Sequence, residues 1–172
     1  MTSGIHHVTG ITAGVQANVD FYAGFLGLRL VKRTGGFEDA EQLHLFYGDA
    51  AGSPGSLISF LVWEAGGRGR VGHGQVAEIA FAVPPASIGD WLTRARDARV
   101  PVEGPVREFG APVLRLKDPD RLIVKLVGAD RPATPRHRTA GLSNGTDTAL
   151  WRHRSVGTSR YDGGVCGTVW LC

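Results

Sequence analysis

A strand, a helix and a second strand are indicated within residues 5–34, and the same pattern returns about seventy positions later. This internal repeat constrains the fold more than any other feature of the chain. Aligning IHHVTGI at residues 5–11 with VAEIAFA at residues 76–82 places His7 on Glu78. The chain is therefore predicted to contain two copies of one structural unit, in which two potential metal ligands occupy the same position.

Alternating apolar residues, separated by turn residues, predict the same order of elements in both units. Strands are expected at about 5–12, 28–34, 42–48, 56–63, 75–83, 105–109, 112–117 and 121–127, and helices with one apolar stripe at about 15–26 and 86–98. The predicted fold class is α+β, with paired βαβββ modules forming cupped mixed sheets. The modules are expected at about 4–64 and 74–128, within a domain of residues 1–130.

Residues 131–172 differ from the rest of the chain in composition. They hold six Arg against two Asp, a balance of +4, whereas the whole chain has a net charge of +3. Pro, Gly, Ser and Thr occur there without a period, which predicts an irregular basic tail. We interpret it as a truncated or altered remnant of a second half. The rest of the chain shows no basic stripe with interleaved aromatics, so nucleic acid is not an expected partner.

The chain also lacks the segments that direct a protein to a membrane or through it. No apolar run approaches the ~18 residues of a membrane span. The first residues, MTSGIHH, show no basic stretch followed by an apolar one. Cys166 and Cys172 lie close to the C-terminus, which does not suit a disulfide framework. We therefore expect no membrane partner and a cytoplasmic location.

Four phrases carry a family resemblance: HHVT at 6–9, DFYAGFLGLRLVKRT at 20–34, LHLFYGDAAGSPGSLISF at 43–60 and GRGRVGHGQ at 67–75. Together with the two modules they resemble the vicinal-oxygen-chelate superfamily, which includes glyoxalases, bleomycin-resistance proteins and extradiol dioxygenases. Within it, the chain is similar to the N-terminal half of ring-cleaving dioxygenases that act on hydroquinone-type aromatics. The resemblance covers roughly residues 4–130.

The resemblance implies a non-haem Fe(II) site, or one for another divalent metal such as Mn or Zn, held by two His and one Glu. Three protein ligands leave positions for a substrate oxygen and O₂, so a small aromatic molecule and O₂ are the implied partners. His7 matches the family's first-strand metal ligand, and His6 matches a neighbouring histidine with a catalytic acid or base role. Adjacent strand residues project to opposite faces, and periodicity alone does not say which of the two binds metal.

The chain departs from the family pattern in its second module. The family's other His and its Glu belong to a later module, and Glu78 and Lys125 stand at the matching positions here. A protonated Lys has no lone pair for a metal, so these two residues are predicted to form a buried or half-buried salt bridge. His44 is interpreted as facing solvent or the cup, without a chemical role.

Three functions stay open from the sequence. The first is a ring-cleaving dioxygenase, of which this chain represents the N-terminal half. The sequence leaves open whether this half is active by itself. The second is a glyoxalase-like homodimeric metalloenzyme, in which His7 of one chain and Glu78 of the other hold a metal after Lys125 is displaced. The third is a metal-free module that binds a small molecule, as resistance proteins do.

Overall fold

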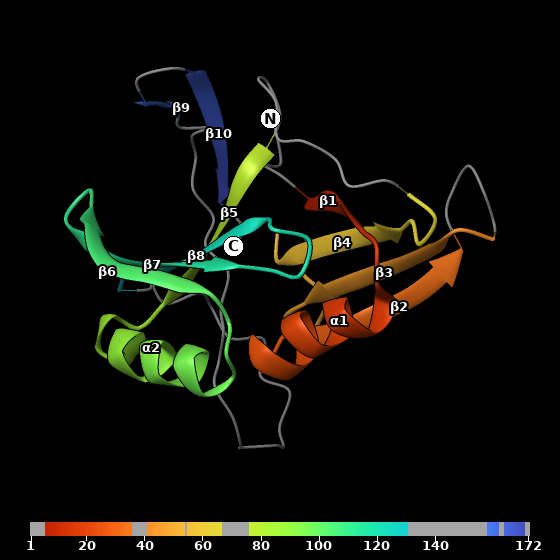
Figure 1. The fold of residues 1–172 in the computed structure, drawn as a ribbon, viewed down its shortest axis with the longest axis horizontal. Helices are drawn as coiled ribbons and strands as arrows, with labels where there is room; N and C mark the ends of the chain where they lie inside the picture. The colour runs from red at the N-terminus through yellow and green to blue at the C-terminus, as the bar shows by residue number, and fades with distance from the viewer. Residues whose placement is uncertain are drawn as a thin grey trace.

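The computed structural model describes residues 6–35, 41–53, 55–66, 76–130, 158–161 and 164–170 (Figure 1). The first module consists of β1 (His7–Thr12), α1 (Val15–Val19), the π-helical segment η1 (Asp20–Phe25), β2 (Arg29–Gly35), β3 (Leu43–Gly48) and β4 (Leu57–Val62). The second consists of β5 (Val76–Val83), the 3₁₀ turn η2 (Pro85–Ser87), α2 (Ile88–Asp97), β6 (Val102–Glu108), β7 (Ala111–Lys117) and β8 (Ile123–Gly128). Two further strands follow, β9 (Thr158–Tyr161) and β10 (Gly164–Trp170).

The strands form two mixed sheets of the same internal order. The four-stranded sheet runs β1-β4-β3-β2, and the six-stranded sheet runs β6-β7-β8-β5-β10-β9. β1 is parallel to β4 as β5 is to β8, while the other pairs within each module are antiparallel. The α+β class and the paired βαβββ modules predicted from the sequence are therefore confirmed.

All eight strands predicted in the two modules are present, although β6 begins three residues before its predicted start at 105. The other differences lie in the helices and at the C-terminal end. The helix expected over 15–26 is α-helical only to Val19 and continues as the wider π-helical turn η1. The helix expected over 86–98 begins as the 3₁₀ turn η2 and is α-helical from Ile88, two residues after the predicted start.

The prediction of an irregular tail differs from the structure over 158–161 and 164–170, which form β9 and β10. β10 pairs in parallel with β5, so these strands extend the second sheet. A strand that completes a partner's hydrogen-bond ladder need not show a long apolar alternation of its own. Residues 131–157 lie outside the described residues, so the domain boundary near 130 stays a prediction.

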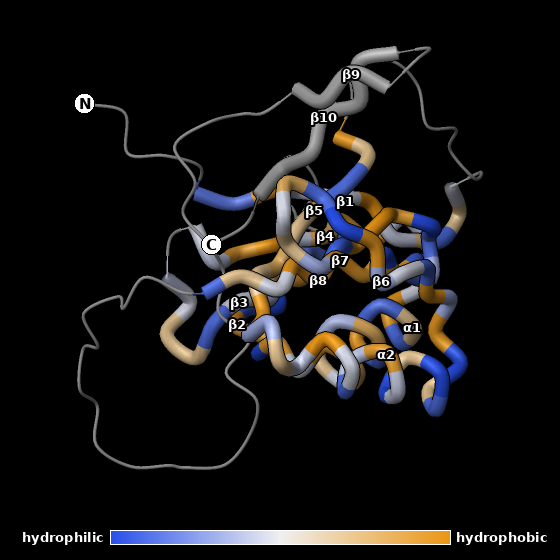
Figure 2. Tube along the Cα trace, turned by 90° about the vertical axis from the view of Figure 1, so that its left-hand side faces the viewer, coloured by the Kyte–Doolittle hydropathy of each residue, from blue (hydrophilic) through white to orange (hydrophobic). Residues whose placement is uncertain are grey.

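One hydrophobic core joins the two modules beneath both sheets. α1 and α2 lie on the same side of the molecule (Figures 1 and 2). Phe25 of η1 contacts Trp91 of α2 with ring centroids 6.0 Å apart, and both side chains are buried. The Arg94 side chain donates a hydrogen bond to the Gly24 carbonyl at 3.0 Å. Apolar side chains from both modules therefore pack together rather than as two separate cores.

The turn between β7 and β8 fastens the second module to the first. The Tyr22 hydroxyl donates to the buried carboxyl group of Asp118 at 2.8 Å. Asp120 accepts hydrogen bonds from the Thr12 hydroxyl and from the backbone N–H of Ala13. These contacts place the end of β1 against the second module and so contribute to the orientation of the strand that carries His7. Within the described part of the chain, no helix is long and apolar enough to cross a membrane.

Candidate functional site

The predicted site lies on the face of the first sheet that points away from the helices. Side chains alternate between the two faces of a strand. Val8, Leu45 and Phe60 pack in the helix-covered core, so their strand neighbours occupy the opposite face. We refer to it as the helix-free face, which includes His7, Thr9, Ile11, His44, Phe46, Leu57, Ser59 and Leu61.

His6 and His7 meet at one end of this face. Their Nδ1 atoms lie 2.9 Å apart, a hydrogen bond in which one imidazole donates and the other accepts. His6 precedes β1, and its carbonyl accepts a hydrogen bond from the N–H of Gly55 at 2.7 Å. The rule that adjacent strand residues point to opposite faces therefore does not separate the two rings. Because the bond uses Nδ1 of His7, its Nε2 atom remains available for a ligand.

An aromatic side chain connects His7 to a second histidine of the face. The Phe46 ring lies 6.0 Å from the His7 ring and 4.2 Å from the His44 ring, between centroids. The Nε2 atom of His44 is buried and has no hydrogen-bond partner among the described residues. Burial lowers the pKa of His44, and the neighbouring His7 and Lys32 lower it further. The lowered pKa favours the neutral form of His44. In the sheet register His44 pairs with Leu61, which lies opposite Ile11 and not opposite His7. The sequence indicated no role for it.

The centre and far end of the face combine hydroxyl and apolar groups. Thr9 and Ser59 are register partners, and their hydroxyl oxygens are 2.8 Å apart. Beyond them Ile11 is 58% exposed, and Trp63, which follows β4, is 55% exposed. The face therefore offers the His6 and His7 imidazoles at one end, a hydroxyl pair in the middle, and His44 together with exposed apolar surface at the other end.

The equivalent face of the second sheet carries an ion-pair network instead. The Lys125 Nζ atom lies 2.5 Å from Glu78 Oε2 and 2.9 Å from Glu108 Oε2. An Arg115 Nη2 atom lies 2.7 Å from Glu108 Oε1, and its Nε atom lies 3.9 Å from Glu78 Oε1. The salt bridge predicted between Glu78 and Lys125 is therefore confirmed. The sequence did not indicate the other two members, because their approach depends on the pairing of β6, β7 and β8.

The described residues do not bring a three-ligand metal site together. Within them, no group of three or more His, Cys, Asp or Glu side chains could hold a metal ion. Glu78, the other sequence-predicted candidate, lies on the second sheet and pairs with Lys125. His7 is thus suited to serve as one ligand, and the remaining donors of a three-ligand set would have to come from elsewhere. The roles assigned to His6 and His7 stay predictions.

Comparison with known proteins places these features in a family context. The model of the Glyoxalase/Bleomycin resistance protein/Dioxygenase superfamily matches residues 4–126. The chain is 40% identical over 126 residues to "Putative ring-cleaving dioxygenase MhqO" of Bacillus subtilis (strain 168), covering 73% of this chain and 40% of that protein. It is 34% identical over 119 residues to "Chlorohydroquinone/hydroquinone 1,2-dioxygenase" of Sphingobium indicum, covering 68% of this chain and 37% of that protein.

Solved structures show the same relation. The crystal structure of a "putative dioxygenase" from Bacillus subtilis matches with a TM-score of 0.70 and 40% identity, over 73% of this chain and 40% of that chain. Glyoxalase I of Leishmania major shares the fold, with a TM-score of 0.61 at 17% identity, over 73% of this chain and 86% of that chain. This chain spans about 40% of the length of the curated relatives it matches.

Proposed function

This chain belongs to the glyoxalase/bleomycin resistance protein/dioxygenase superfamily. From that premise we propose that it functions as part of a ring-cleaving dioxygenase that acts on hydroquinone-like aromatics. The proposal includes a non-haem Fe(II) ion, with His7 as one of its protein ligands and His6 as the adjacent acid or base. The relatives named above support the dioxygenase branch. The matched part of those relatives is less than half of their length, and the proposal assigns the further ligands to residues outside the described ranges.

The position of His7 is the observation that carries the proposal. It lies on the helix-free face, at the start of β1, and is exposed. A metal-binding histidine ordinarily hydrogen-bonds its second ring nitrogen to a neighbouring group, which fixes the orientation of the ring. The His6–His7 hydrogen bond meets that requirement with Nδ1 and leaves Nε2 for the ion. Bound there, a divalent ion would supply a Lewis-acid centre for a substrate oxygen and O₂.

The rest of the helix-free face suits an aromatic substrate. Phe46 beside His7 offers a ring against which another ring can pack. The Thr9–Ser59 hydroxyl pair can exchange its mutual hydrogen bond for one to a phenolic oxygen. A hydroquinone combines these two properties, since it has a flat apolar body with a hydroxyl at each end.

The ion-pair network counts against the homodimeric alternative. In a homodimer of that kind, Glu78 would have to break its ion pair with Lys125 before it could bind a metal held by His7 of a partner chain. The Glu78 and Lys125 side chains are only 13% and 7% exposed, and removing one partner of such a pair leaves the other charge poorly solvated. The metal-free binding module remains the second candidate, because the described residues offer no complete ligand set.

Anaerobic calorimetric titration of the purified chain with Fe(II) tests the proposal. His7→Ala should weaken binding about tenfold or more, which corresponds to ~1.4 kcal/mol or more. His6→Ala should weaken Fe(II) binding less than His7→Ala does, because His6 contacts the His7 ring and does not ligate the ion. His44→Ala is the matched control on the same face and should bind as the parent does.

Oxygen uptake with hydroquinone, measured on the Fe(II)-loaded chain, tests the reaction itself. Equal loss of Fe(II) affinity in the His6 and His7 variants would defeat the ligand assignment. A parent chain that binds hydroquinone without any metal, and consumes no O₂, would favour the metal-free binding module. Fe(II) binding without O₂ uptake would show that the chain holds the ion but requires the missing donors for turnover.

A further inference from the structure

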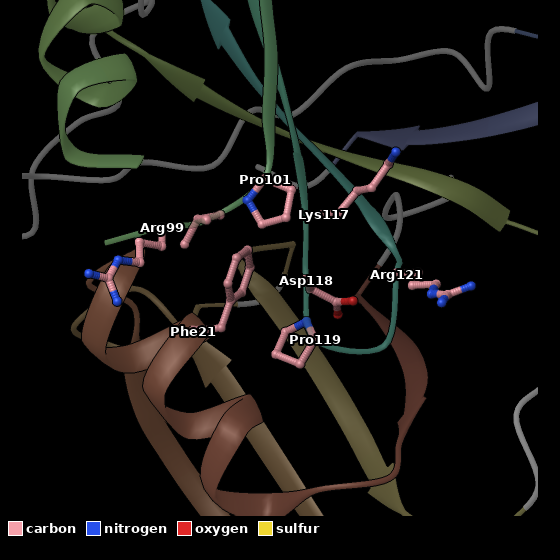
Figure 3. Close-up of a pocket in the computed structure, with 8 residues that line it drawn as sticks. Phe21, Arg99, Pro101, Lys117, Asp118, Pro119 and Arg121 are labelled. Carbon is pink, nitrogen blue, oxygen red and sulfur yellow. The ribbon is translucent and has the colours of Figure 1, made fainter. Parts of the chain in front are cut away.

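A cavity of about 590 Å³ lies on the helix side of the molecule, away from the helix-free face. It is formed where the residues following α2 meet the turn between β7 and β8 (Figure 3). Phe21 of η1, Val100, Pro101 and Pro119 provide an apolar lining. The cavity therefore has contributions from both modules, and no part of the proposed dioxygenase reaction uses it.

Two arginines border this cavity in a backbone conformation that normally favours glycine. Arg99 has φ 55° and Arg121 has φ 73°. Arg99 follows the end of α2, where the N–H of Val100 donates to the Ala95 carbonyl at 2.8 Å, a helix ending that most often has Gly at this position. Residues with a Cβ rarely adopt such φ values, because the Cβ atom then comes too close to the carbonyl oxygen. Strained residues of this kind cluster at functional sites.

Among the residues that the structure describes, neither Arg99 nor Arg121 forms an ion pair. Arg99 and Arg121 are both exposed. The third cation of the lining, Lys117, pairs with Glu103 at 3.3 Å, and both side chains are about half exposed or more, at 49% and 66%. A surface pair of this kind contributes little and exchanges readily with another anion. The cavity thus has three cations with at most one weak pairing.

The one acidic residue of the lining does not compete for these cations. Asp118 accepts hydrogen bonds at Oδ1 from the backbone N–H groups of Asp120 and Leu122, at 2.9 and 2.8 Å. Its Oδ2 atom accepts from the Tyr22 hydroxyl at 2.8 Å. Both oxygens of its carboxyl group therefore already accept hydrogen bonds, from its own turn and from the first module.

We propose that this cavity binds a small organic dianion whose two negative groups stand at opposite ends of an apolar body. Figure 3 shows Arg99 and Arg121 on opposite sides of the cavity, with their guanidinium groups pointing outward and Phe21 between them. Exposed side chains change rotamer in picoseconds to nanoseconds, so both guanidinium groups can turn toward a bound anion. The apolar body then packs on Phe21 and the prolines, and each arginine meets one carboxylate, with two parallel hydrogen bonds available to it.

Terephthalate is a suitable probe, because it places two carboxylates at opposite ends of one ring. When terephthalate is added to the ¹⁵N-labelled chain, we expect the NMR amide signals of Val100, Lys117 and Arg121 to shift and the shifts to saturate. Benzoate, which has one carboxylate, should bind at least about tenfold more weakly, a difference of ~1.4 kcal/mol. Equal affinities for the two compounds would overturn the dianion assignment.

Glycine substitution separates binding from folding at these two positions. Arg99→Gly and Arg121→Gly remove the charge and also the strained Cβ, so each variant should unfold at the same temperature as the parent or higher. The double variant should bind terephthalate at least about tenfold more weakly. Arg33→Ala, which removes an exposed charge from β2, is the control and should keep the parent's affinity. A parent chain without saturable shifts, or a double variant with unchanged affinity, would refute the site.

Discussion

Replacing Lys125 by Met should destabilise the protein strongly, because it removes the cation shared by two carboxylates. The Nζ atom of Lys125 contacts Glu78 and Glu108 at 2.5 and 2.9 Å, and the Lys125 side chain is 7% exposed. Met keeps most of the aliphatic stem and forms no ion pair. Removing one partner of a fully buried pair costs about 3–5 kcal/mol.

The cost here should lie below that range. The Glu78 and Glu108 side chains are 13% and 23% exposed, so water reaches part of each carboxylate. Arg115 also remains within 2.7 Å of Glu108. We therefore expect the free energy of unfolding to fall by about 2–3 kcal/mol, and the melting temperature by about 5–10 °C for a chain of this size.

Urea unfolding followed by tryptophan fluorescence measures the effect, and Lys117→Met is its matched control. Lys117 also pairs with a glutamate, at 3.3 Å, but its side chain is 49% exposed. Its substitution should change stability by no more than about 0.5 kcal/mol. If both variants lose the same stability, burial does not decide the value of these ion pairs and the reasoning is refuted.

Burial raises the pKa of Asp118 from 3.8 to about 6, so the folded protein retains a proton there that the unfolded chain has lost. The stability from this group is fully present below about pH 4 and is lost as pH rises to about 6, by about 2–3 kcal/mol in all, and urea unfolding of Asp118→Asn should lack that pH slope. A Cβ at Gly10 would lie 2.8 Å from the Phe60 ring, so Gly10→Ala should lower stability by about 1–3 kcal/mol. A Cβ at Gly89 in α2 would meet nothing within 4 Å, so Gly89→Ala should raise stability by about 0.5–1 kcal/mol. A retained pH slope, or the same midpoint in both alanine variants, would contradict these expectations.

The sequence alone determined the repeat and the elements within it. Alternation of apolar residues reports which side of a strand is buried, and this property is local to each segment. It was sufficient to place all eight strands of the two modules and both helices. The family resemblance also identified Glu78 and Lys125 as a pair, because both stand at positions that match the family's ligands and a protonated Lys attracts a carboxylate.

The tertiary structure decided which distant residues share a surface with His7. Phe46 comes near it only because β4 lies between β1 and β3 and sets their register. No local pattern encodes register between strands far apart in the chain, since pairing depends on hydrogen bonds made after the chain has folded. The same reason explains why Glu108 could not be assigned to the network of Lys125. It also explains why β10 was not expected, because its partner β5 supplies the ladder that makes it a strand.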